Sequence, residues 1–329
     1  MNALIPANNT PAALDHATPA SSIAANLERH AHGARGSFAS ATERAWKADS
    51  LVFSAWCFQA GLDPLPAAPD TVARFVDAMG EVKAPATVRR YLASIAHQHK
   101  AAKLASPTQE DAVTNALKRL NRAKGTAQKQ ASGLNRPLVD RMLAAAPHTL
   151  LGARNRALLA VAYDTLCRRS ELAGLQVADL VAAADGSATV TIHRSKTDQE
   201  GQGTVRYLAA DTMRHVTAWL TQADVTDGAL FRAVNKGGRV GGAIDGGELP
   251  RLYKAMAAAA GVPASIVAGI SGHSSRVGAA QDMVGLGIEM PAVMQAGGWR
   301  TPAMVARYTA RIDARRSGAA KMAAMQDRS

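Results

Sequence analysis

A stretch of fourteen residues without apolar periodicity divides this chain into two parts. Residues 124–137 read KGTAQKQASGLNRP and combine Gly, Ser, Pro and polar side chains, a composition typical of a connecting segment. A chain of 329 residues is also long enough for two hydrophobic cores. We therefore predict two domains, residues 25–123 and 136–329, joined by a linker over 124–135. Residues 1–24, rich in Pro, Asn, Ser and Thr, are expected to form a flexible arm.

The part before the linker is predicted to be an all-helical bundle. Ser40 and Glu43 have the spacing of a capping box at the start of its first helix, and Asp70 is the expected N-cap of the second. Alanine, which has the highest helix propensity, supplies much of the apolar content. Apolar side chains recur at helical spacing in four segments, residues 40–61, 69–80, 85–104 and 108–125.

The part after the linker combines helices with one β-hairpin. Two β-rich runs, residues 187–197 and 203–210, flank the polar turn DQEGQ and predict antiparallel strands. The predicted fold class is therefore mostly α, with a small antiparallel β-sheet in a mixed, mainly α second domain. Helices are expected over 150–167, near 211–223, 248–260 and 274–286, in two short segments that carry Met294 and Tyr308, and in a tail at about 315–326.

The charge of the chain indicates a polyanionic partner. Lys and Arg number 38 against 26 Asp and Glu, so the formal net charge is +12. Nucleic acid is the first candidate for such a partner and an anionic membrane surface is the second. Cys57 and Cys167 are expected to be buried thiols of a reducing compartment. With no long apolar run and no secretory signal pattern, we expect a cytoplasmic protein with no membrane span.

Several residues of the second part have the chemistry that cleavage of a phosphodiester requires. The transition state gathers negative charge on two non-bridging oxygens, which guanidinium groups bind bidentately. The reaction also needs a nucleophile and a proton donor for the departing oxygen. The candidates are Arg168 at the end of the buried helix, Glu171, Lys196 in the hairpin turn, His273 and Arg276 at a helix start, Trp299 after a Gly-Gly turn, and Tyr308.

Each of these residues also has an ordinary structural explanation. Arg168 and Glu171 are spaced as a helix ion pair, and Lys196 in a turn is usually solvated. Histidine is often structural, and tryptophan and tyrosine are usually core or interface residues. The order in which these residues occur along the chain favours a shared chemical role.

Two motifs resemble the tyrosine recombinase (integrase) family. They are AYDTLCRRSELAGLQVADL, residues 162–180, and SGHSSRVGAAQDMVGLGIEMPAVMQAGGWRTPAMVARYTAR, residues 271–311. The family pattern of Arg, Lys, His-x-x-Arg, His or Trp, and Tyr is met at every position and in order. A weaker similarity extends upstream, so that the resemblance spans about residues 35–311.

This resemblance implies a role for each candidate. Tyr308 would attack the scissile phosphate and form a 3′-phosphotyrosine, while Lys196 would protonate the departing 5′ oxygen. Arg168, supported by Glu171, and Arg276 would hold the non-bridging oxygens, with His273 assisting proton transfer and Trp299 donating a hydrogen bond. The sequence has no Asp/Glu/His cluster with metal-ligand spacing and no Walker-type loop. We therefore expect neither a metal nor ATP, and no other cofactor.

The resemblance also implies a substrate and an assembly. The first domain would clamp double-stranded DNA that carries an inverted-repeat site, and a homotetramer would form on two such sites through the C-terminal helix, without any membrane. A solvated surface is the alternative explanation of the basic residues proposed to contact DNA, which are Lys47, Arg89, Arg90, Lys118, Arg119, Arg122, Lys124, Lys236 and Arg239.

Three other functions remain open at this point. The same chemistry would serve a type IB topoisomerase or a hairpin-forming telomere resolvase, and a catalytically silent DNA-binding regulator is also possible. Neither the target sequence nor the biological task, whether integration, excision or dimer resolution, follows from the residues.

Overall fold

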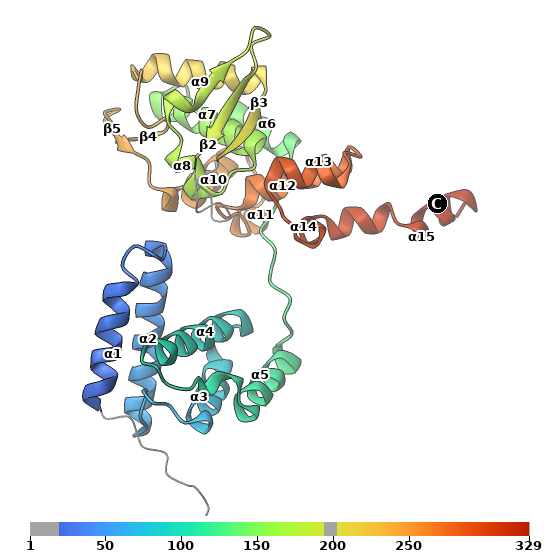
Figure 1. The fold of residues 1–329 in the computed structure, drawn as a ribbon. Helices are drawn as coiled ribbons and strands as arrows, with labels where there is room; N and C mark the ends of the chain where they lie inside the picture. The colour runs from blue at the N-terminus through green and yellow to red at the C-terminus, as the bar shows by residue number, and fades with distance from the viewer. Residues whose placement is uncertain (1–19, 194–202, 329) are drawn as a thin grey trace, which may run out of the picture. The chain divides into compact units, whose positions relative to one another are not determined.

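The computed structural model describes residues 20–193 and 203–328, and the chain divides into two compact units between Gln128 and Lys129. Each unit has a hydrophobic core of its own. The mostly helical fold class predicted from the sequence is confirmed, and the small sheets are antiparallel (Figure 1).

The first unit is entirely helical in its described part. The rings of Phe53 and Phe75 meet edge to face at 4.9 Å between their centres, within a core that also holds Val72, Val88 and Ile95. Its helices are α1 (Ala20–Gly33), α2 (Ser40–Ala60), α3 (Pro69–Val82), α4 (Pro85–Ala101), the short η1 (Pro107–Gln109) and α5 (Asp111–Lys124).

Two predicted helix caps in this unit and the predicted end of the arm were wrong. Helix α1 begins at Ala20, so residues 20–24 are helical and not part of the arm; the rest of the predicted arm lies outside the described residues. Ser40 is the first residue of α2 and forms no cap bond with Glu43. Asp70 lies inside α3, because Pro69 occupies the first turn, where its fixed φ and missing N–H are tolerated.

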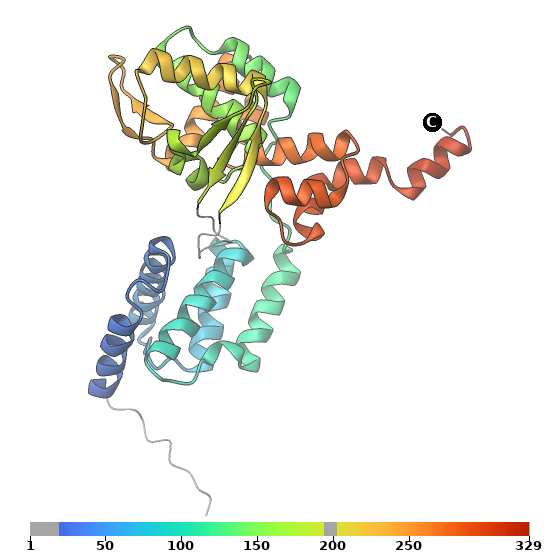
Figure 2. The same cartoon turned by 45° about the horizontal axis from the view of Figure 1, so that its top comes forward.

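The second unit packs helices around a three-stranded sheet. It contains α6 (Arg136–Ala145), α7 (Leu150–Thr165), α8 (Arg169–Gly174), η2 (Val177–Asp179), β1 (Leu180–Ala182), β2 (Ala188–Ile192), β3 (Thr204–Leu208), α9 (Ala210–Ala223), β4 (Arg232–Val234), β5 (Val240–Ala243), η3 (Gly246–Glu248), α10 (Leu249–Ala259), α11 (Ala264–Ala268), α12 (Ser274–Gly285), α13 (Met290–Gly297), α14 (Pro302–Arg315) and α15 (Gly318–Met325). Figure 2 shows the sheet and the helices beside it from a second direction.

The predicted hairpin is confirmed by the pairing of β2 with β3. The two strands are antiparallel, and Val190 lies opposite Arg206. Alternate residues of β2, among them Val190 and Ile192, are buried in the main core with Leu158 and Trp219 of α7 and α9. The turn residues between the strands, including Lys196, lie outside the described residues.

A second apolar cluster holds α12, α13 and α14 together. Leu166 and Val305 are fully buried there, together with Trp299. The sequence did not predict the hairpin of β4 and β5 or the short α11, and it predicted a shorter α14 than the 14 residues observed. Cys57 and Cys167 are buried free thiols, as expected. Among the described residues, no helix has the length and apolarity needed to cross a membrane.

Candidate active site

Arg168 and Glu171 form a bonded pair at the start of α8. The chain leaves α7 through Leu166, which has a left-handed backbone with φ of 52°, and Arg168 is the extended residue before α8. Its predicted position at the end of the buried helix is therefore wrong, because the turn at Leu166 ends α7. One oxygen of Glu171 accepts from the Arg168 backbone amide at 2.8 Å and the other from its guanidinium at 2.6 Å.

Arg276 is held at the ends of two helices. Its guanidinium donates to the carbonyl of Leu166, just after α7, at 2.5 Å and to the carbonyl of Gly297, the last residue of α13, at 2.6 Å. Carbonyls at helix C-termini carry partial negative charge, so they favour a cation. Burial, followed by the nearby Arg168, lowers the pKa of Arg276 to about 10, which still leaves it protonated at neutral pH.

The Gly-Gly turn places Trp299 over Arg276. Gly298 ends α13 in the left-handed region, with φ of 61°. A Cβ atom on Gly297 would overlap the Trp299 ring, and one on Gly298 would lie 2.8 Å from a terminal nitrogen of Arg206. Two glycines are therefore needed for the indole to fold back, and its centre lies 4.3 Å from the guanidinium carbon of Arg276.

Tyr308 lies on α14 next to two of the other candidates. Its ring centre is 5.8 Å from that of Trp299 and 6.4 Å from that of His273. The side-chain amides of Gln130 and Gln281 each donate a hydrogen bond of 3.0 Å to the backbone carbonyl of Tyr308. The nucleophile proposed from the sequence is therefore fixed from two sides through its own backbone.

His273 precedes α12 and is half-buried. Burial lowers its pKa below the usual 6.5, and the positive charges of Arg276 and Arg168 act in the same direction. The imidazole is therefore neutral near pH 7 and is able to accept a proton.

A small cavity of about 60 Å³ is lined by Arg168, Glu171 and Arg276. Organic ligands of ordinary size need several times this volume, so the cavity suits one compact group. The residues that line it are Thr165, Leu166, Arg168, Glu171, Ile192, Thr204, Arg206, Arg276, Gly297 and Gly298. Arg206 was not a sequence candidate, because a single basic residue in a predicted strand has no distinguishing spacing.

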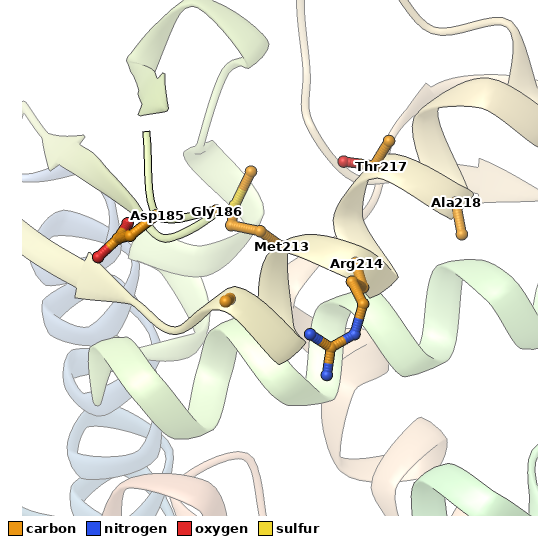
Figure 3. Close-up of a pocket in the computed structure, with 7 residues that line it drawn as sticks. Asp185, Gly186, Met213, Arg214, Thr217 and Ala218 are labelled. Carbon is orange, nitrogen blue, oxygen red and sulfur yellow. The ribbon is translucent and has the colours of Figure 1, made fainter. Parts of the chain in front are cut away.

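The structure thus brings Arg168, Glu171 and Arg276 to one cavity, with His273, Trp299 and Tyr308 beside Arg276. Lys196, the remaining candidate, lies outside the described residues. A larger hollow of about 540 Å³ is lined by residues of α9 and of the β1–β2 turn, among them Asp185, Met213 and Arg214 (Figure 3). None of the candidate catalytic residues that the structure describes lines that hollow.

The basic residues proposed to contact DNA are all exposed. Some of them have partners within the first unit: Arg90 forms an ion pair with Asp49 at 3.0 Å, and Arg119 with Asp77 at 2.9 Å. The exposed set in this unit is Lys47, Arg89, Arg90, Lys118, Arg119, Arg122 and Lys124, whereas Lys236 and Arg239 lie in the turn between β4 and β5.

Comparison with known proteins agrees with the motifs. The sequence model of the phage integrase family matches residues 134–315, more than half of the chain. The recombinase cre of Escherichia phage P1 is 28% identical over 294 residues, which are 83% of this chain and 85% of that protein. The integrase/recombinase xerD homolog of Selenomonas ruminantium is 27% identical over 281 residues, which are 81% of this chain and 80% of that protein.

Solved structures share the fold. A lambda integrase, solved as a tetramer bound to a Holliday junction, matches with a TM-score of 0.57 and 14% identity, over 87% of this chain and 77% of that one. The family match includes the ion-paired Arg168, the buried Arg276 and Tyr308. The chain belongs to the phage integrase family, the tyrosine recombinases that its two motifs resemble.

Proposed function

We propose that this chain is a site-specific DNA recombinase that breaks and rejoins strands through a 3′-phosphotyrosyl link on Tyr308. The observation that carries the proposal is the position of Arg276. Its guanidinium is buried under Trp299, is held by two helix-end carbonyls, and lines the same cavity as Arg168. Two fixed guanidiniums beside a tyrosine are the arrangement that an attack on a phosphodiester requires.

In this proposal the chemical step is a direct attack of a tyrosine on phosphorus. The phenolic oxygen of Tyr308 forms a bond to phosphorus while the bond from phosphorus to the 5′ oxygen breaks. His273, neutral near pH 7, takes the phenolic proton, and Lys196 gives a proton to the departing oxygen. Arg168 and Arg276 balance the charge on the non-bridging oxygens, and the indole N–H of Trp299 adds a donor. Reversal of these transfers with another strand's 5′ hydroxyl rejoins the DNA, so the step consumes no ATP.

The first unit and the linker provide further contacts to DNA in this proposal. The basic residues of α2, α4 and α5 are exposed, and the net charge of the chain is +12. Contacts to backbone phosphates make affinity depend steeply on salt, because bound counterions are released. In this proposal residues 25–123 serve as the DNA-clamping domain and residues 136–329 as the catalytic domain.

We further propose that four copies assemble on two inverted-repeat sites and pass through a Holliday junction. Helix α15 supports this assembly, because none of its residues is buried and Met322 and Met325 are 50% and 88% exposed. Figures 1 and 2 both show it projecting beyond α14. An apolar helix that the described part of its own chain leaves exposed suits a cyclic exchange between neighbours. Because the substrate is DNA, we place the protein in the cytoplasm, at the nucleoid.

Covalent capture tests the proposed chemistry. Fragmented DNA of the source organism is incubated with the protein, denatured in detergent, and the fragments that stay attached to protein are sequenced. We expect an enriched site with inverted repeats for the unaltered chain and no attached DNA for Tyr308→Phe. Retention of DNA without a covalent link in the unaltered chain would contradict the proposal.

A second assay separates recombination from simple relaxation of supercoils. Two copies of the captured site are placed on one plasmid, and exchange between them is scored together with topoisomer distribution. Exchange that requires both sites supports a recombinase. Relaxation that proceeds without exchange would instead identify a topoisomerase.

A further inference from the structure

A third guanidinium, that of Arg206, lines the same cavity as those of Arg168 and Arg276. Arg206 is on β3, opposite Val190 of β2, in the middle of the strand pairing. Its position is therefore set by the register of the sheet and not by the segment that contains Arg168 or Arg276.

The guanidinium of Arg206 is held by the end of α13. Its Nη1 donates to the carbonyl of Gln295 at 2.8 Å. Its Nη2 lies against Gly298, where an added Cβ would come within 2.8 Å. The contact with Gln295 uses one of five N–H donors. With respect to the other described residues, donors of this half-buried guanidinium therefore remain for a group in the cavity.

The charges around the cavity do not balance. Among the described residues, Arg168, Arg206 and Arg276 line it with a single carboxylate, that of Glu171, and this carboxylate is bonded to Arg168. Within residues 20–193 and 203–328, Arg206 forms no ion pair with a carboxylate. Burial lowers the pKa of Arg206, and so does the neighbouring charge of Arg168. Burying positive charges close together destabilises the charged forms of these side chains. Such an arrangement is typical of a site that binds an anion.

We propose that Arg206 is a catalytic residue that contacts the scissile phosphate together with Arg168 and Arg276. This inference rests on the proposed function and adds a residue to it. A phosphodiester carries one negative charge in the ground state and more on its equatorial oxygens in the transition state. The pairing of Arg168 with Glu171 offsets one positive charge. With Arg206 present, the described residues that line the cavity still carry two positive charges in excess when the phosphate enters.

The competing role is purely structural. Through Gln295 and Gly298, Arg206 also contacts the turn that holds Trp299 over Arg276, so its loss could act indirectly. The two roles differ in their dependence on substrate charge, because a residue that only supports the turn acts equally on a charged and an uncharged phosphorus centre.

The test compares two substrates with the variants Arg206→Ala and Arg206→Lys. Both substrates are suicide duplexes of the captured site, nicked so that the released fragment diffuses away, and in one of them a methylphosphonate replaces the scissile phosphate. We expect Arg206→Ala to slow single-turnover formation of the covalent complex by about 100-fold or more on the phosphodiester. On the uncharged methylphosphonate, Arg206→Ala should slow the reaction by less than about fivefold, since there is less charge to balance. On the phosphodiester, the rate of Arg206→Lys should lie between those of the unaltered chain and Arg206→Ala.

Arg214→Ala is the matched control, because it removes the same charge from an exposed position on α9 outside the cavity. If Arg206→Ala were slowed equally on both substrates, the inference would be overturned and only the structural role would remain. Cleavage of the phosphodiester by Arg206→Ala at the unaltered rate would also overturn the inference. Failure of the unaltered chain to form any covalent complex would instead overturn the proposed function, and the two failures are therefore distinguishable.

Discussion

The guanidinium carbon of Arg276 lies 4.3 Å from the centre of the Trp299 ring. The indole thus covers a cation that has little contact with solvent, and Trp299 itself is only 6% exposed. Stacking of arginine on an aromatic face stabilises the cation while it remains able to donate hydrogen bonds. This pair links the core of α12–α14 directly to the candidate active site.

Substitutions of Trp299 should separate its packing role from its hydrogen-bonding role. Trp299→Phe keeps an aromatic face over Arg276 but loses the N–H donor, so we expect cleavage to slow by about 10- to 100-fold with a small loss of stability. Trp299→Ala should lower the free energy of unfolding by about 3–5 kcal/mol, because it empties a buried site. Denaturant unfolding measures the packing role and single-turnover cleavage measures the hydrogen-bonding role. If Trp299→Phe and Trp299→Ala lost the same activity and did not differ in stability, this division would be contradicted.

Removal of the charge on Glu171 should affect activity and stability together. Glu171→Gln retains one acceptor but no longer balances Arg168, so we expect cleavage to fall by about tenfold and stability by about 1–3 kcal/mol. The matched control is Glu248→Gln, whose ion pair with Arg251 is long, at 3.4 Å, and exposed. Thermal unfolding of both variants is the measurement. A loss in Glu248→Gln as large as that in Glu171→Gln would contradict a special role for the buried pair.

The pH dependence of cleavage should reflect His273. Because burial and the nearby arginines lower its pKa below 6.5, the neutral base predominates at neutral pH and is lost only in more acidic solution. We expect the single-turnover rate to rise with pH through an apparent pKa below 6.5 and then to level off, and His273→Gln to abolish this rise. If the rate of His273→Gln still rose with pH over the same acidic range, another group would be responsible for the rise.

The same shift predicts the direction of a stability change. The unfolded chain binds a proton at His273 near pH 6.5, whereas the folded chain binds it only at lower pH. The contribution of His273 to the free energy of unfolding is therefore complete above pH 6.5. It declines as the pH falls from 6.5 toward the lower pKa that His273 has in the folded chain. Denaturant unfolding of the unaltered chain and of His273→Gln between pH 5 and pH 8 measures the difference, which should grow on acidification.

The two glutamine amides on the Tyr308 carbonyl should contribute to positioning the nucleophile. Removing either hydrogen bond, in Gln130→Ala or Gln281→Ala, is expected to cost about 0.5–1.5 kcal/mol, a fall of about 2- to 10-fold in the cleavage rate. DNA affinity, measured separately, should change much less. The double variant tests whether the bonds act together, because its loss should differ from the sum of the single losses. Unchanged cleavage in all three variants would contradict the positioning role.

Contacts of α5 with DNA should be visible in the salt dependence of binding. If Lys118 and Arg122 each neutralise one phosphate, replacing both with Gln should reduce the slope of log affinity against log salt by about 1.8. Affinity for unrelated sequences should fall in parallel, because phosphate contacts carry no sequence information. An unchanged slope would indicate that both residues are merely solvated.

The sequence was sufficient for features that depend on local spacing. The helical periodicity before residue 124, the hairpin of β2 and β3, and the His-x-x-Arg pair at the start of α12 all follow from neighbours a few residues apart. The helix caps predicted at Ser40 and Asp70 were wrong, although α2 and α3 begin where the periodicity placed them. A capping pattern competes with residues such as Pro69 and with packing that the local sequence does not reveal.

Residues within the predicted linker illustrate the limit of this local information. Residues 124–135 were expected to connect the domains without structure of their own. In the structure, Gln130 donates to the carbonyl of Tyr308, and the backbone of Leu134 is bonded to Ser274 at the start of α12. These contacts join positions more than a hundred residues apart, and no spacing rule connects them.

By itself, the sequence determined the helical fold class, the family and the candidate residues of the active site, because these depend on periodicity and on the order of motifs along the chain. Only the tertiary structure decided how charge is arranged around the cavity. The left-handed turn at Leu166 sets Arg168, the carbonyls of two helix ends hold Arg276, and the register of β3 brings in Arg206. Electrostatic interactions depend on distance through space and on burial, and both arise only when segments remote in sequence pack together.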